Sequence, residues 1–155
     1  MHGPIHSITC LFFYGALLFA GPFVHAQETA DHPSADRVVT LPSGAVIHAE
    51  VVQTPAARQK GLMFRDHLPK SAGMLFLFPR PASYQFWMKN CKFPLDMIWL
   101  NEKKEVVHLV EKAPPCSADP CPQYGPTDRV ALYVLEINAG LARKERLKLG
   151  SRLHF

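Results

Sequence analysis

The segment from Met97 to Val110, MIWLNEKKEVVHLV, indicates the fold most directly. Two apolar runs flank the polar residues Asn101 to Lys104, which suits a turn between two antiparallel strands. The stretch RVVTLPSGAVIHAEVVQ, residues 37 to 53, has a similar pattern, with two strands about a Pro-Ser-Gly turn and alternating apolar positions in its second half. The sequence therefore predicts two β-hairpins.

Further strands are expected in other short apolar runs. GMLFLF, residues 73 to 78, is a continuous apolar run ended by Pro79, typical of a strand covered on both faces. The segments Tyr84 to Met88 and Ala131 to Ile137 are further expected strands, and RLHF at the C-terminus is the last. This gives seven or eight short strands.

Two short helices complete the predicted elements. Thr54 followed by Pro55 is a helix start, since Thr caps free N–H groups and Pro suits the first helical position; this helix is expected to run to about Phe64. The second is expected from Asn138 to Gly150. The fold class is therefore mainly β (β-rich α+β), a single compact antiparallel-rich barrel or sandwich.

The N-terminal segment has the pattern of a signal peptide. No charged side chain of Lys, Arg, Asp or Glu occurs before Glu28, and Ile8 to Phe19 is an apolar run shorter than the roughly 20 residues that span a bilayer. Cleavage is expected between Ala26 and Gln27, which directs the chain to the periplasm or the extracellular space. The alternative is that the segment is not cleaved and anchors the protein. In that case the chain would contact the membrane through this segment only.

The rest of the chain has the size of one domain. Residues 1 to 26 are the expected signal peptide, 27 to 36 a polar disordered linker, and 37 to 155 the folded β domain. The net charge of +4 comes from scattered positive residues that form no stripe with aromatic side chains. Nucleic-acid binding is therefore not expected.

Three cysteines lie in the mature chain: Cys91, Cys116 and Cys121. In an exported protein thiols tend to oxidise, and the four residues between Cys116 and Cys121 allow a small structural disulfide loop. A redox pair is the functional alternative, although such pairs favour a tighter Cys-x-x-Cys spacing. Pairing of Cys91 with one of the other two also stays open.

Three blocks of sequence, RQKGLMFRDHLPKSAGMLFLFP, FWMKNCKFPLDMIWL and YVLEINAG, resemble the DUF192 family, also called UPF0127. The resemblance covers roughly Arg37 to Phe155. It implies a compact β-rich domain with short helices, often exported, and it supplies no established biochemical activity. At Cys91 the family commonly has a small polar residue such as Thr, which argues against an essential thiol there.

Asp96 and Glu136 are carboxylates within apolar strands, and a buried carboxylate is costly unless it is paired. One hypothesis makes them the acid and base of a hydrolytic, glycan-directed enzyme. The alternative pairs them with Arg58 and Arg65 as buried ion pairs that need no ligand.

A binding pocket is the leading hypothesis for the polar residues near the second family block. Lys89 and Asn90 offer donors and a Trp offers a flat face, although Asn90 also suits a simple turn. The candidate ligand-binding residues are Arg58, Arg65, Trp87, Met88, Asn90, Asp96 and Glu136.

The first functional hypothesis is that the protein is an exported, non-enzymatic binding or accessory domain, which binds a small ligand or an envelope component. No signature of a common enzyme class is present. Four methionines with Cys91 give a copper carrier as another alternative, but methionine also fills irregular core gaps. No catalytic residue, metal or cofactor is assigned from the sequence.

Overall fold

The structure is a computed structural model that describes residues 36–155. The expected signal peptide, its cleavage site at Ala26 and Gln27, and nearly all of the expected linker lie outside the described residues. Within residues 36–155, no helix is long and apolar enough to cross a bilayer.

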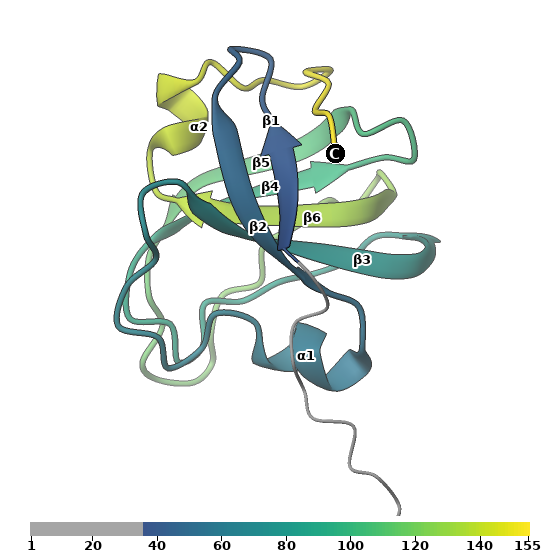
Figure 1. Cartoon of the computed structure of the whole chain (residues 1–155). Helices are drawn as coiled ribbons and strands as arrows, with labels where there is room; N and C mark the ends of the chain where they lie inside the picture. The colour runs from purple at the N-terminus through teal and green to yellow at the C-terminus, as the bar shows by residue number, and fades with distance from the viewer. Residues whose placement is uncertain (1–35) are drawn as a thin grey trace, which may run out of the picture.

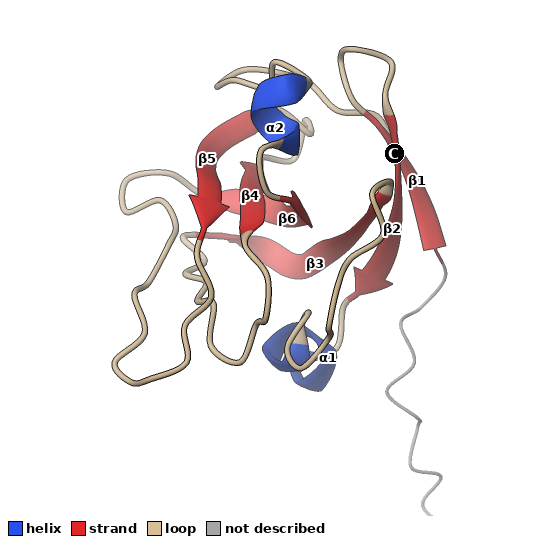
Figure 2. Cartoon of the chain, turned by 90° about the vertical axis from the view of Figure 1, so that its left-hand side faces the viewer, coloured by secondary structure: helices blue, strands red, loops and turns tan. Residues whose placement is uncertain are grey.

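Six strands form one curled sheet in the order β1-β2-β3-β6-β4-β5 (Figures 1 and 2). The strands are β1 (Asp36–Thr40), β2 (Val46–Val52), β3 (Ala72–Ala82), β4 (Leu95–Leu100), β5 (Val106–Ala113) and β6 (Ala131–Asn138). Only β2 and β3 are parallel; the other neighbours are antiparallel. The predicted mainly β class with two short helices is confirmed, and because the sheet is not closed, a sandwich describes it better than a barrel.

The two helices lie on opposite sides of the sheet. Figures 1 and 2 show α1 (Pro55–Lys60) below β3, and α2 (Leu141–Lys144) at the other end, near β4 and β5. The side chains of β2 to β6 alternate between two hydrophobic clusters, whereas β1 contributes to one of them. One cluster, on what we call the α2 face, contains Ile98 and Ala142; the other, on the α1 face, contains Trp99 and Leu62.

Both predicted hairpins are confirmed. In the first, β1 pairs with β2; in the second, β4 pairs with β5. The turn of the second hairpin depends on Asn101, whose side-chain oxygen accepts hydrogen bonds from the backbone N–H groups of Lys103 (2.9 Å) and Glu105 (3.0 Å). Asparagine commonly forms such side-chain turns.

Both helices are shorter than predicted, because residues with positive φ end them or delay them. The first was expected to reach Phe64 but ends at Lys60, since Gly61 has φ +48°. The second was expected from Asn138 to Gly150. Asn138 instead ends β6, Gly140 (φ +84°) precedes the helix, and α2 has only four residues.

Three strand predictions also differ from the structure. β3 does not stop before Pro79 but runs to Ala82, although its pairing with β6 is interrupted between Leu77 and Ala82, where prolines offer no N–H. Residues 84 to 88 and the C-terminal RLHF form isolated bridges instead of strands. The C-terminal bridges join His154 to β1 and Arg152 to the start of β5, so this segment links the two edges of the sheet.

Asp96 connects three elements on the α2 face. Its side chain is fully buried, and its two carboxylate oxygens accept hydrogen bonds from the backbone N–H groups of Lys112 (2.8 Å) and Ala142 (2.8 Å). Lys112 lies near the end of β5 and Ala142 lies in α2. The carboxylate therefore holds β4, β5 and α2 together, and backbone donors compensate its burial.

We expect Asp96→Ala to lower the free energy of unfolding by about 2 to 4 kcal/mol, because it leaves two buried N–H groups without acceptors. Asp96→Asn should fall between this variant and the wild type, since it keeps one acceptor oxygen. Asp66→Ala is the control, because the Asp66 side chain is 83% exposed in its pair with Lys92 and its loss should change the stability little. Urea denaturation measures all three, and equal losses for Asp96→Ala and Asp66→Ala would contradict this role of Asp96.

Candidate functional site

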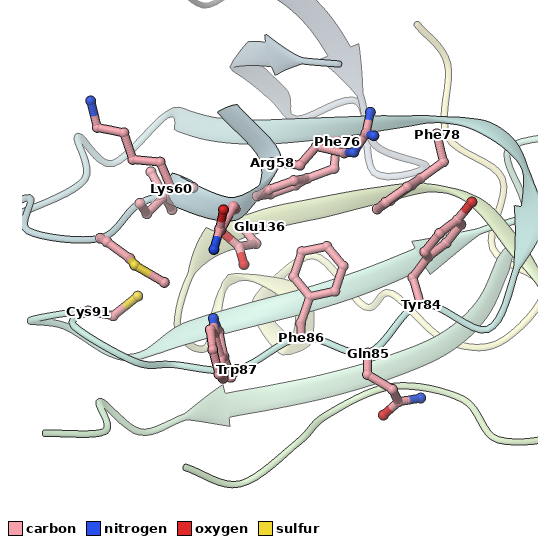
Figure 3. A pocket seen from close by; sticks show the side chains of 14 residues that line it. Arg58, Lys60, Phe76, Phe78, Tyr84, Gln85, Phe86, Trp87, Cys91 and Glu136 are labelled. Atoms are coloured by element: carbon pink, nitrogen blue, oxygen red, sulfur yellow. The ribbon is translucent and has the colours of Figure 1, made fainter. Parts of the chain in front are cut away.

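A pocket of about 270 Å³ lies on the α1 face, between α1 and the segment that follows β3 (Figure 3). Helix α1 and the turn after it supply one wall, and residues 84 to 87 supply the opposite wall. The lining residues are Arg58, Gln59, Lys60, Gly61, Leu62, Met63, Phe76, Phe78, Tyr84, Gln85, Phe86, Trp87, Cys91 and Glu136. The pocket thus combines five aromatic side chains with several polar ones, among them one carboxylate from β6.

The aromatic rings of the pocket are fixed by one another. The ring of Phe86 meets Phe76 edge-on at 4.9 Å between centroids, and meets the buried Trp99 edge-on at 5.7 Å. Phe78 and Tyr84 stack at 3.5 Å. Edge-on and stacked pairs are favourable arrangements of aromatic rings, so the walls of the pocket are formed before any ligand arrives.

The segment from Cys116 to Tyr124, which begins with a disulfide loop, supports the wall that carries Phe86. The backbone N–H and C=O groups of Phe86 exchange hydrogen bonds with those of Tyr124 (2.7 and 2.8 Å), and the N–H of Cys116 donates to the carbonyl of Met88 (3.0 Å). Cys116 and Cys121 form the predicted disulfide, which confirms that pairing, and Cys91 remains a free thiol. The closed loop therefore lies directly against the segment that lines the pocket.

Glu136 is the buried polar group of this pocket. Its residue is only 5% exposed, and its neighbours across the ladders are Met74 on β3 and Met97 on β4. In the part of the chain that the structure describes, no hydrogen bond or ion pair reaches its carboxylate. Burial in these apolar surroundings raises the pKa of Glu136 from 4.5 to about 8. Near neutral pH the free pocket therefore holds this group mainly in its protonated form.

The arginines do not pair with the two strand carboxylates, so that prediction is wrong. Arg65 makes a two-pronged ion pair with Glu50, with one contact of 2.7 Å, and this pairing lowers the pKa of Glu50. Arg58 donates to the backbone carbonyls of Gln53 and Leu77, and its guanidinium lies 5.1 Å from the centre of the Phe78 ring. Both cations are thus engaged away from Glu136.

Three of the seven candidate ligand-binding residues come together at the pocket: Arg58, Trp87 and Glu136. Figure 3 shows Glu136 at the centre of the lining side chains, between the end of α1 and Trp87. Trp87 is 38% exposed, so part of its ring is available from solvent.

The other four candidates lie elsewhere. Met88 is fully buried in the hydrophobic cluster of the α1 face, and Arg65 is engaged with Glu50. Asn90 has φ +57°, and its carbonyl accepts a hydrogen bond from the N–H of Phe64 (2.9 Å), which agrees with the interpretation of Asn90 as a turn residue. Its side chain lines a shallower hollow beside the pocket. Asp96 lies on the α2 face, where it accepts hydrogen bonds from the backbone of β5 and α2.

Asp96 and Glu136 do not form an acid–base pair. In the ladder between β4 and β6, Asp96 lies opposite Ile137, the residue that follows Glu136. Because successive residues of a strand point to opposite faces, the two carboxylates lie on opposite sides of the sheet. A glycan hydrolase that uses this pair needs both groups in one cleft, a condition that this register does not meet.

The residues of the copper hypothesis are also divided. Met63 and Cys91 line the pocket, whereas Met74, Met88 and Met97 are buried in the core of the α1 face. Burial raises the pKa of the Cys91 thiol to about 11, with a smaller contribution from Glu136, so this sulfur is mainly a thiol and not a metal-binding thiolate near neutral pH. Between residues 36 and 155, no three side chains of His, Cys, Asp or Glu come together as a metal site.

Similarity to a known protein family extends over nearly all of the described domain. A family model, DUF192, described as "Uncharacterized ACR, COG1430", matches residues 38–155. The chain belongs to the DUF192 family. Among curated proteins, none matches it.

Two crystal structures resemble this DUF192 domain. A protein of unknown function from Novosphingobium aromaticivorans DSM 12444 is 32% identical, with a TM-score of 0.69 over 83% of this chain and 98% of that chain. A protein from Sinorhizobium meliloti 1021, for which a role as a transcription regulator has been suggested, is 31% identical, with a TM-score of 0.68 over 77% of this chain and 93% of that chain. These likenesses support the fold and the family and assign no activity to the pocket.

Sequence reasoning missed most of the aromatic residues of this DUF192 pocket. Phe76 and Phe78 lie on β3, while Tyr84 and Phe86 lie on the irregular segment after it. The sequence placed Phe76 and Phe86 in ordinary apolar strands, because apolar periodicity does not distinguish a ring that packs in a core from one that lines a cavity.

We expect the stability of the domain to depend on the ionisation of Glu136. Between pH 4.5 and about 8 the folded protein keeps a proton that the unfolded chain releases, so the free energy of unfolding should fall as pH rises. The slope from this one group is at most about 1.4 kcal/mol per pH unit. In Glu136→Gln this contribution is removed, so the variant should gain stability relative to the wild type as pH rises.

Urea denaturation at pH 5, 6.5 and 8 measures this difference. Glu102→Gln makes the same chemical change in the exposed turn between β4 and β5, and it should follow the wild type at each pH. A constant difference between the wild type and Glu136→Gln across this range would show that burial does not hold the proton on Glu136.

Proposed function

We propose that this DUF192 protein is an exported, non-enzymatic domain that binds a small ligand in the pocket of the α1 face. The observation that carries the proposal is Glu136, a residue that is only 5% exposed, whose carboxyl group lines the pocket and has no protein partner within residues 36–155. Buried polar groups are normally hydrogen-bonded, and an unpaired one is costly. A bound molecule that offers a donor or a positive charge would supply the missing partner.

The dimensions of the pocket fit a small ligand. A volume of about 270 Å³ is close to the lower end of the range for small-molecule sites, which suits one ring with a short substituent. Apolar and aromatic walls give affinity through apolar contact, and a few polar groups, here including Glu136, give orientation. Because the rings already pack against one another, little ordering of the walls would be required on binding.

The groups around Glu136 favour binding over catalysis. Acid–base catalysis needs a second group within reach that exchanges protons near the working pH. Cys91 has its pKa raised to about 11, and Arg58 is held by backbone carbonyls over Phe78. Asp96, the other candidate for an acid–base pair, lies on the opposite side of the sheet.

Fragment binding followed by two-dimensional NMR tests this function. We expect single-ring fragments at millimolar concentration to shift, saturably, the backbone signals of Phe76, Trp87 and Glu136. Trp87→Ala should weaken the binding of the best fragment by about tenfold, which corresponds to the roughly 1.4 kcal/mol of a lost ring contact. Val38→Ala, at an exposed position on β1, should leave the affinity unchanged. If no fragment shifts the pocket signals, the proposed function is wrong.

Export is the second part of the proposal. It is supported by the signal-peptide pattern of residues 1 to 26 and by the disulfide between Cys116 and Cys121, a bond typical of oxidising compartments. We expect the full chain, expressed in a bacterial host with a periplasm, to be recovered from the periplasm with Gln27 as its first residue. Mass spectrometry of the intact protein measures this, and a membrane-bound product that retains Met1 would contradict cleavage.

A further inference from the structure

On the premise of the proposed function, we infer that the ligand of this pocket is a small organic cation whose ammonium group meets the carboxylate of Glu136 and whose apolar part lies against Phe86 and Trp87. The inference concerns the charge of the ligand. It is carried by the distribution of charged groups around the pocket and by the aromatic walls.

Glu136 is the only acidic residue among those that line the pocket. The strands on either side of it present the neutral side chains Met74 and Met97. The next carboxylate on the same face is that of Glu50, which lies across from Met74 on β2 and is already paired with Arg65. A ligand that reaches Glu136 therefore meets one carboxyl group whose charge is not balanced by a protein cation.

The two basic residues that line the pocket do not occupy this position. Arg58 is held over Phe78 by two backbone carbonyls, so its charge has a partner ring and acceptors already. Lys60 belongs to the last turn of α1, and Figure 3 shows its ammonium group directed away from Glu136. Tyr84 and Cys91, the other titratable residues of the lining, carry no positive charge in either of their protonation states. The position next to Glu136 is thus open to an external cation.

The aromatic walls favour the same charge. The face of an aromatic ring carries a partial negative charge and attracts ammonium groups, most strongly in a water-excluded site. Phe76, Phe86 and Trp87 line the pocket near Glu136. An anionic ligand is opposed by the ring faces and by the carboxylate form of Glu136, whereas a cation is attracted by both.

A cation and a neutral ligand differ in what happens to the proton of Glu136. A neutral alcohol can bind the protonated acid and leave its proton in place. An ammonium group forms an ion pair only with the carboxylate, so the proton leaves Glu136 and passes to the buffer. Binding of a cation should therefore strengthen as pH rises toward about 8, the pKa of the free group, by up to tenfold per pH unit.

Three probes of nearly equal size separate these cases: benzylamine, benzyl alcohol and benzoate. We expect benzylamine, which stays cationic over the range used, to bind the full mature domain at least tenfold more tightly than benzyl alcohol at pH 7.5. Its affinity should rise threefold to tenfold between pH 6.5 and 7.5, and benzoate should not bind. NMR titration of the pocket signals gives each Kd.

The proton release is measured on the wild-type protein alone, by calorimetry of benzylamine binding in buffers with different ionisation enthalpies. Close to one proton should be released at pH 6.5. This measurement does not depend on the folding of any variant. In Glu136→Gln the preference for benzylamine over benzyl alcohol should disappear, while Glu102→Gln should retain it.

The outcomes separate the inference from the proposed function. If benzyl alcohol or benzoate binds the pocket as tightly as benzylamine, or if benzylamine binds without proton release, the inference about the cation is wrong and the binding function stands. If neither these probes nor the single-ring fragments shift the signals of the pocket, the binding function itself is wrong.

Discussion

A carboxylate buried within a sheet needs partners, and this sheet supplies them on one face only. Asp96 on β4 receives two backbone N–H groups, from β5 and α2. Glu136, on the neighbouring strand, receives none from residues 36–155, although it is 95% buried. Both lie at the centre of the fold, where the alternation of β4 and β6 sends them to opposite faces. The fold depends on the first carboxylate, and the pocket is defined by the second.

The unpaired state of Glu136 costs stability in the free protein. Transfer of a carboxyl group to apolar surroundings favours its neutral form, and the raised pKa expresses this cost. Glu136 differs from an ordinary core residue, because its burial lowers the stability of the fold and it lines an open pocket. A leucine at the same place would remove this loss of stability. Function often requires such a local departure from optimal stability. The environment of Glu136 therefore supports the proposal that this residue binds a ligand.

The local parts of the fold were predictable, and the parts set by distant contacts were not. Both hairpins, the strand with Glu136 and the disulfide follow from alternation, turn residues and short spacing. The helix ends were missed because positive φ values at Gly61 and Gly140 override apolar spacing. For the site, the candidates Arg58, Trp87 and Glu136 line one pocket, and their role in binding stays a prediction. The separation of Asp96 from Glu136 depends on the register between β4 and β6, which no local pattern contains.

The irregular segment after β3 explains how a domain of this size builds a pocket outside its main sheet. Residues 84 to 91 form no strand, so their backbone groups need other partners. The segment from Cys116 to Tyr124, which begins with the disulfide loop, provides them through Cys116 and Tyr124. A disulfide limits the freedom of such a loop. Phe86 is therefore held edge-on between Phe76 and Trp99 without a ligand. Since ordering side chains on binding reduces affinity, a wall fixed in advance would let the proposed ligand bind through few contacts.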